Sequence, residues 1–75
     1  MLVHVAIETE TGAAPVVAER LAFVKGLTLH EVEGGDRLIG MLRAPDRCPI
    51  GDVLRFFRTD PAVVGVHHLA TEESG

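Results

Sequence analysis

The side chains of this 75-residue chain that are most able to do chemistry are four histidines and a single cysteine. Imidazole is the commonest protein ligand for transition metals and changes its charge near neutral pH. His4, His30 and His67 are therefore considered first as a metal site. Structural zinc needs four ligands and catalytic zinc three, and no cysteine or carboxylate is spaced to complete such a set. We predict neither a metal nor another cofactor, and we interpret the histidines as surface or interface residues.

Cys48 follows Arg47, a cation that would favour the thiolate. A nucleophile also needs a base and an oxyanion donor held beside it, and the sequence indicates neither next to Cys48. We therefore predict that the chain has no catalytic residue and is not an enzyme. A lone cysteine cannot form an internal disulfide, and the first residues do not have the pattern of a signal peptide. The cytoplasm is the expected compartment.

Composition narrows the possible partners. The formal net charge is −4 and the seven basic residues are scattered, which argues against direct binding of nucleic acid. No apolar run approaches the roughly 20 residues that a membrane-spanning helix requires. Hydrophobic residues make up 47% of the chain, which is high for a domain with so small an interior. We expect another chain to cover part of this apolar surface, as in a homodimer or a higher homo-oligomer.

Turn residues divide the chain into six segments with strand or helix periodicity. Strands are predicted at residues 2–8, 27–33, 38–43 and 63–69, and helices begin near Thr11 and Pro49 and end before Gly26 and Asp60. Residues 70–75 are expected to be a flexible tail. The order strand, helix, strand, strand, helix, strand predicts one ferredoxin-like βαββαβ domain over residues 1–75, an α+β sandwich with two helices on one face of a four-stranded antiparallel sheet.

That topology leaves the other face of the sheet uncovered. Alternation along the first and last strands sends one set of side chains under the helices, namely Val3, Val5, Ile7, Val64 and Val66. The same alternation gives the uncovered face His4, Ala6, Val63, Gly65, His67 and Leu69. Because the last strand is expected to pair with the first, His4 and His67 are predicted to be neighbours. We predict a partner interface formed by His4, Ala6, Val63, His67 and Leu69.

A family resemblance runs over most of the chain. The segments that carry it are Ile7-Glu8-Thr9-Glu10-Thr11-Gly12, Val16-Val17-Ala18-Glu19-Arg20-Leu21, Gly26, Val32-Glu33-Gly34-Gly35-Asp36-Arg37-Leu38-Ile39 and Arg43-Ala44-Pro45-Asp46. These resemble the ligand-binding domain of Lrp/AsnC regulators, also called the regulation-of-amino-acid-metabolism domain. The resemblance implies an effector-binding and oligomerisation module without the DNA-binding part. It also implies that Gly34, Gly35 and Asp36 contact a small amino-acid-like effector, with Asp36 meeting an amino group or a backbone N–H.

Two other resemblances stay open. Leu29-His30-Glu31-Val32 and Arg37-Leu38-Ile39, with a short helix ending before Pro61, are similar to NapD-type chaperones. This resemblance implies that the twin-arginine signal peptide of an exported reductase docks on the uncovered face, where acidic side chains meet its arginines. Gly12 and Gly26 flank the first helix in a way that also resembles the ACT domain.

Overall fold

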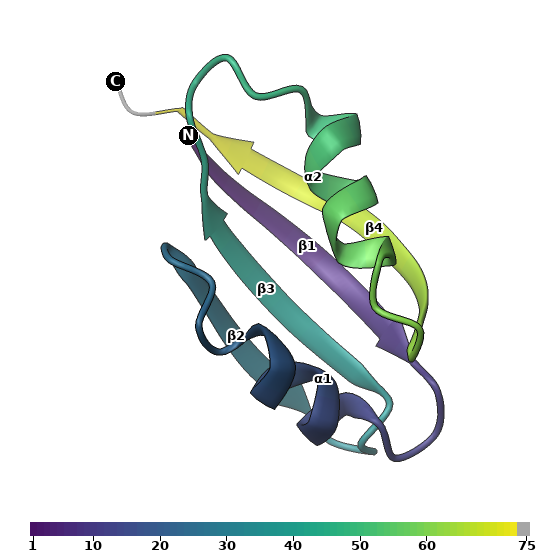
Figure 1. Cartoon of the computed structure of the whole chain (residues 1–75). Helices are drawn as coiled ribbons and strands as arrows, with labels where there is room; N and C mark the ends of the chain where they lie inside the picture. The colour runs from purple at the N-terminus through teal and green to yellow at the C-terminus, as the bar shows by residue number, and fades with distance from the viewer. Residues whose placement is uncertain (74–75) are drawn as a thin grey trace.

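The structure, a computed structural model, describes residues 1–73 and has the element order β1-α1-β2-β3-α2-β4 (Figure 1). The elements are β1 Leu2–Thr9, α1 Ala14–Leu21, β2 Leu27–Val32, β3 Arg37–Arg43, α2 Ile50–Arg58 and β4 Val63–Glu72. The sheet order is β2-β3-β1-β4, and all three pairs of neighbouring strands are antiparallel. Both helices lie on one face of this sheet (Figure 1). The predicted ferredoxin-like α+β fold is confirmed.

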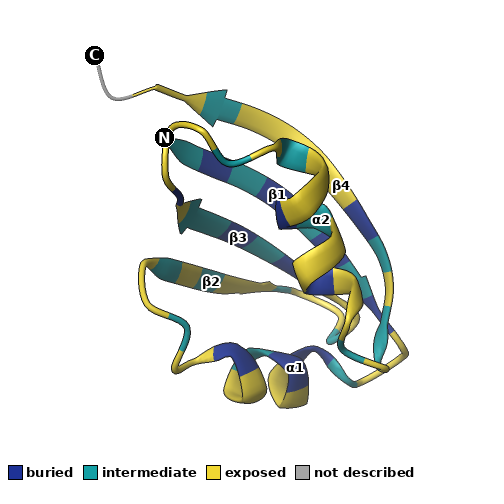
Figure 2. Cartoon of the chain, turned by 45° about the horizontal axis from the view of Figure 1, so that its top comes forward, coloured by how far each residue is buried: buried dark blue, intermediate teal, exposed yellow. Residues whose placement is uncertain are grey.

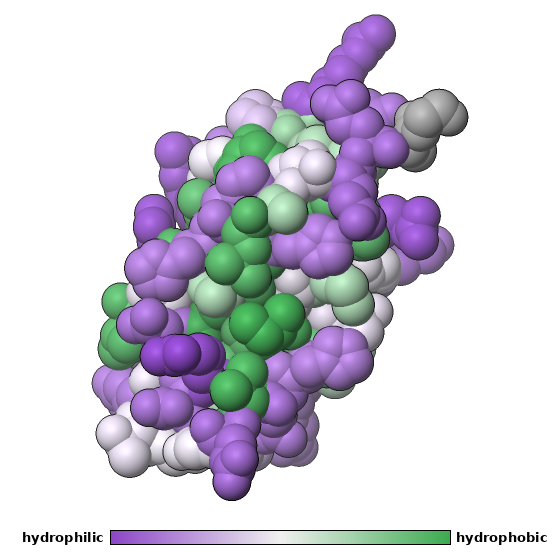
Figure 3. Space-filling model, turned by 180° about the vertical axis from the view of Figure 1, so that it is seen from behind, coloured by the Kyte–Doolittle hydropathy of each residue, from purple (hydrophilic) through white to green (hydrophobic). Residues whose placement is uncertain are grey.

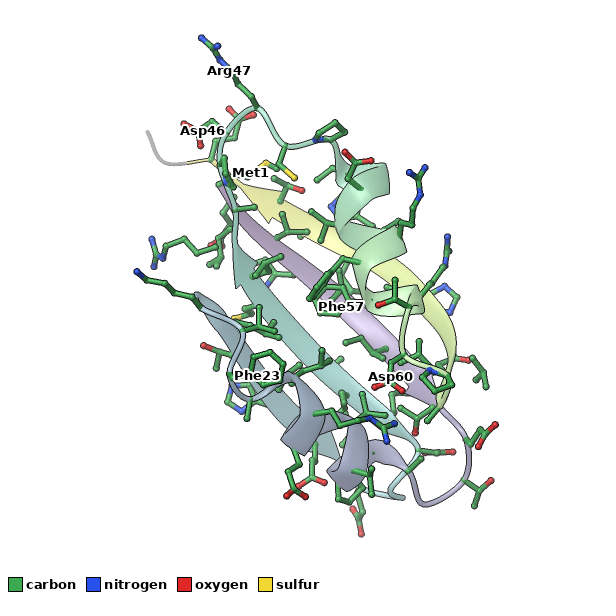
Figure 4. All side chains as sticks on the ribbon, in the orientation of Figure 1. Met1, Phe23, Asp46, Arg47, Phe57 and Asp60 are labelled. Carbon is green, nitrogen blue, oxygen red and sulfur yellow. The ribbon has the colours of Figure 1, made fainter. Side chains whose placement is uncertain are left out.

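The core lies between the helices and the sheet, and alternate residues of β1 form its sheet side. Val3, Val5 and Ile7 are completely buried, while the residues between them are only partly buried (Figure 2). The two helices close the core with side chains that recur at helical spacing. The helical contribution is Ala14, Val17, Leu21, Val53 and Phe57. Phe57, the largest buried side chain, points from α2 toward the sheet (Figure 4).

The first helix is shorter than its apolar periodicity predicts. Thr11 does not cap it, since the N-cap residue is Ala13 and no side chain caps this end. The N–H of Ala14 instead donates to the carbonyl of Gly35 at 3.0 Å, so the β2–β3 hairpin satisfies one of the N–H groups at the start of this helix. Val24 lies beyond the helix but packs against the core. No helix among residues 1–73 combines the length and apolar character needed to cross a membrane.

The last strand is longer and less regular than predicted. Ala70, Thr71 and Glu72 pair with the first residues of β1, so half of the expected flexible tail belongs to the sheet. Of that tail, residues 74–75 lie outside the described residues. Two shifts of pairing interrupt β4, one between His4 and Val5 of β1 and one between Glu8 and Thr9. Each shift gives β4 one more residue than its partner strand, as in a β-bulge.

Candidate functional site

The face of the sheet opposite the helices is the candidate site, and the pairing of strands defines its residues. Cross-strand partners point to the same face of a sheet. The even-numbered residues of β1 point to the open face, and so do their partners in β3 and β4 and, in turn, the β2 partners of those β3 residues. The resulting apolar members are Leu2, Ala6, Val32, Ile39, Met41 and Ala70. Figure 3 shows this side of the molecule, where a hydrophobic band runs along its length between hydrophilic side chains. We call Leu2, Ala6, Val32, Ile39 and Met41 the apolar band.

The band is accessible although each of its members is partly buried by its neighbours on the sheet. Ile39 lies near its centre, paired with Ala6 on one side and with His30 on the other. Met41 lies one step further along β3, between His4 and Thr28. A continuous apolar surface with polar margins is typical of a surface that binds another macromolecule.

Two of the histidines at the margin pair with carboxylates. The Nε2 atom of His67 lies 3.2 Å from Oε1 of Glu8, and the Nε2 atom of His4 lies 3.5 Å from Oε2 of Glu72. The His4 Nε2 atom is buried and makes no hydrogen bond within residues 1–73. Gly65, opposite Glu8, leaves the first of these pairs uncrowded.

The predicted proximity of His4 and His67 is only partly realised. Both lie on the open face, but His4 is opposite Ala70 and His67 is opposite Ala6, so they stand in successive rows. Within the part of the chain that the structure describes, no group of three or more histidine, cysteine, aspartate or glutamate side chains is placed to hold a metal ion.

Basic side chains occupy a different strand of the open face from the acidic ones. Arg37 and Arg43 stand at the two ends of β3, whereas Glu8 ends the β1 row and Glu72 lies at the far end of β4. Arg37 is the cross-strand partner of Glu8, and Leu2 separates Arg43 from Glu72. The open face is therefore basic along β3 and acidic along β1 and β4 at both of its ends.

The bulges correct two predicted positions. Val63 is opposite the buried Thr9 and packs against the core, so it lies under the helices and does not belong to the open face. Val64, predicted to be covered, is the extra residue of that bulge and is 63% exposed. Leu69 is the extra residue of the second bulge and is also exposed. Of the predicted interface residues, the structure places His4, Ala6 and His67 together on the open face.

The predicted effector residues lie in the hairpin between β2 and β3. Gly34 and Gly35 have φ angles of 118° and 74°, which side chains on L-residues rarely adopt, so both glycines are explained by turn geometry. The carbonyls of Gly35 and Asp36 accept hydrogen bonds from Ala14 and Thr9, so the hairpin is joined to the start of α1 and to the end of β1. The Asp36 side chain makes no hydrogen bond or ion pair within residues 1–73 and is available to a ligand.

On the helix side, Cys48 lines a mostly apolar hollow of about 290 Å³ together with Val24, Leu42, Val53 and Phe56. Its Sγ atom lies 3.8 Å from the carbonyl oxygen of Pro49. A second hollow of about 520 Å³ adjoins the end of the open face at Leu2, Arg43 and Glu72. The amino group of Met1 beside it donates to Asp46 Oδ1 at 2.7 Å, while Arg47 points outward (Figure 4).

An ion pair between Arg20 and Asp60 lies on the helix side of the sheet. Arg20 of α1 binds the carboxylate of Asp60 through two hydrogen bonds of 2.8 and 2.7 Å, which links α1 to the turn before β4. These bonds lower the pKa of Asp60 against the opposing effect of burial, and the backbone N–H of Ala62 lowers it further. The same hydrogen bonds raise the pKa of Arg20.

Most of the apolar band was not predicted from the sequence. Alternation in the sequence predicts faces only for the first and last strands, and it predicts none for Val32, Ile39 and Met41. The alternation of Ile39 and Met41 with Leu38, Gly40 and Leu42 is a usable signal once β3 is known to be central, because one face of a central strand must be buried under the helices. Val32 of β2 then follows as the cross-strand partner of Arg37. Comparison with family models, with curated proteins and with solved structures gave no significant match.

Proposed function

We propose that this chain is a small assembly domain that binds a second copy of itself through its open sheet face. The observation that carries this proposal is the apolar band, which runs along a face that neither helix covers (Figure 3). Burying apolar surface is the main favourable term in association between proteins. A standard interface takes roughly 800 Å² from each partner. This is about a sixth of the chain's accessible surface of 4769 Å², an extent that one broad face of a two-layer domain can supply.

The resemblance to the Lrp/AsnC ligand-binding domain supports an effector role in addition to assembly. We propose that a small amino-acid-like molecule binds beside the hairpin, with the Asp36 carboxylate accepting hydrogen bonds from its amino group. The free side chain of Asp36 and the close backbone approach that Gly34 and Gly35 allow support this part of the proposal.

The alternative is a NapD-like chaperone that binds a twin-arginine signal peptide on the same face. The carboxylates of Glu8 and Glu72 favour this alternative, since both flank the apolar band and would meet arginine side chains. Calorimetric titration with such a peptide separates the two proposals. Binding at micromolar concentration to a monomeric chain would favour the chaperone over the assembly domain.

The self-assembly proposal is tested by placing a charge in the band. Ile39→Glu puts a carboxylate at the centre of the proposed interface and should weaken the dimer by roughly a hundredfold, because the charge must be desolvated on association. Phe23→Glu is the matched control, since Phe23 is 84% exposed and lies on the helix side (Figure 4). Sedimentation equilibrium of both folded variants gives the dissociation constants. An Ile39→Glu chain that associates like the unchanged chain would contradict the proposal.

A further inference from the structure

We infer that the two copies pack with a two-fold axis parallel to their strands, so that Arg37 of each copy meets Glu8 of the other. This inference rests on the proposed function, which already assigns the open face to a second copy. It follows from the distribution of charge on that face and from the two symmetric ways in which such faces stack with their strands aligned.

A two-fold axis parallel to the strands and passing between β3 and β1 lays β3 of one copy over β1 of the other and keeps equivalent strand ends together. Arg37 then lies over the second copy's Glu8, and Glu8 lies over the second copy's Arg37. At the opposite end, Arg43 lies over the second copy's Leu2, next to the second copy's Glu72. Each arginine and glutamate at the margin of the open face then meets an opposite charge or the neighbour of one.

A two-fold axis in the plane of the interface but perpendicular to the strands gives the other aligned packing. It lays β3 over β3 with the strand direction reversed, so Arg37 of one copy lies over the second copy's Arg43. Like charges then meet at both ends of the interface. Such contacts select against this arrangement, since unfavourable juxtaposition is a common source of specificity.

The distances allow the proposed contacts. Stacked sheets lie about 10 Å apart, and an arginine and a glutamate side chain extended toward each other can span that gap. Arg37 is exposed and the Glu8 side chain is 44% exposed, so both can reorient on association. Ile39 and Ala6, in the row next to this charged pair, continue the contact with apolar packing at the centre.

The inference is tested by reversing the charge of Arg37 in one chain and of Glu8 in another, and by mixing the two variant chains. The Arg37→Glu chain alone would place glutamates over glutamates, and the Glu8→Arg chain alone would place arginines over arginines. Each is expected to weaken self-association about tenfold or more. An equimolar mixture restores two opposite-charge contacts, and it should form heterodimers with an affinity within about threefold of the unchanged chain. Arg55→Glu is the matched control, because Arg55 is 80% exposed on α2 and the same reversal there should leave association unchanged.

The outcomes separate this inference from the proposed function. Circular dichroism first establishes that each variant is folded. If the Arg37→Glu chain associates as well as or better than the unchanged chain, the perpendicular arrangement is favoured and the inference is overturned, while self-assembly stands. If each single charge reversal weakens association and the equimolar mixture does not restore it, the inferred packing is wrong while the proposed self-assembly still stands. If the unchanged chain is monomeric at every concentration, the proposed function fails and the inference fails with it.

Discussion

Thr9 of β1 lies opposite Val63 of β4, whereas the preceding residue, Glu8, lies opposite Gly65. Val64 is therefore the extra residue between two paired positions. The bulge turns Val63 inward, where it packs against the core beside the buried Thr9. This single irregularity decides which of the valines of β4 belong to the core and which belong to the surface.

The bulge predicts that alanine substitutions at Val66 and at Val64 lower the free energy of unfolding by different amounts. Val66→Ala removes a side chain that is 3% exposed and should lower the free energy of unfolding by about 2 kcal/mol. Val64→Ala removes one that is 63% exposed and should change it by less than about 0.5 kcal/mol. Urea denaturation of both variants at one protein concentration measures the difference. Equal losses would mean that Val64 is buried as the simple alternation predicts.

The Arg20–Asp60 pair predicts a pH-dependent contribution to stability. The folded-state pKa of Asp60 is below its unfolded value, so the pair stabilises the fold above the unfolded pKa of about 3.9. That contribution is lost as the pH falls through the folded-state pKa. Asp60→Asn should therefore lower Tm by roughly 5 °C at neutral pH, and this difference should narrow as the pH falls below the unfolded pKa of Asp60. A gap between the two melting curves that stays constant across this range would contradict the assignment.

In the β2–β3 hairpin, we expect Gly35 to matter for stability and the Asp36 side chain to matter for ligand binding. Gly35→Ala should cost about 1 kcal/mol of stability, because alanine is strained at a φ of 74°. Asp36→Asn should cost less than about 0.5 kcal/mol, since the backbone carbonyl of Asp36, and not its side chain, accepts the hydrogen bond from Thr9. Thermal melts measure both. If the hairpin binds an amino-acid-like effector, Asp36→Asn should abolish the calorimetric signal without lowering Tm.

The fold could be predicted from the sequence because each element has its own signal. Alternation in residues 2–8 and the apolar spacing of Ile50, Val53 and Phe57 match the observed β1 and α2 closely. The end of the first helix was missed since Leu21 and Val24 both fit a helical pattern, and only the packing of the following turn shows that Val24 lies outside it.

The candidate site was less predictable for a different physical reason. Strand pairing depends on tertiary packing, and a shift of one residue moves a side chain to the opposite face. His4, Ala6 and His67 were placed correctly because the alternation holds between the bulges. The faces of Val63 and Val64 are the reverse of those predicted because strict alternation takes no account of a bulge, although Gly65, an isolated glycine within the strand, is a residue that often marks one. The apolar band emerges only when β3 is seen to lie next to β1.

Sedimentation equilibrium of the unchanged chain, over concentrations from about 1 µM to several hundred micromolar, tests self-assembly through the open face most directly. The chain mass is 8.0 kDa, and the proposed dimer predicts a rise to twice that mass as the concentration increases. The dissociation constant should be micromolar or tighter, as a largely apolar interface of standard size provides. A constant mass of 8.0 kDa across the whole range would contradict the proposal.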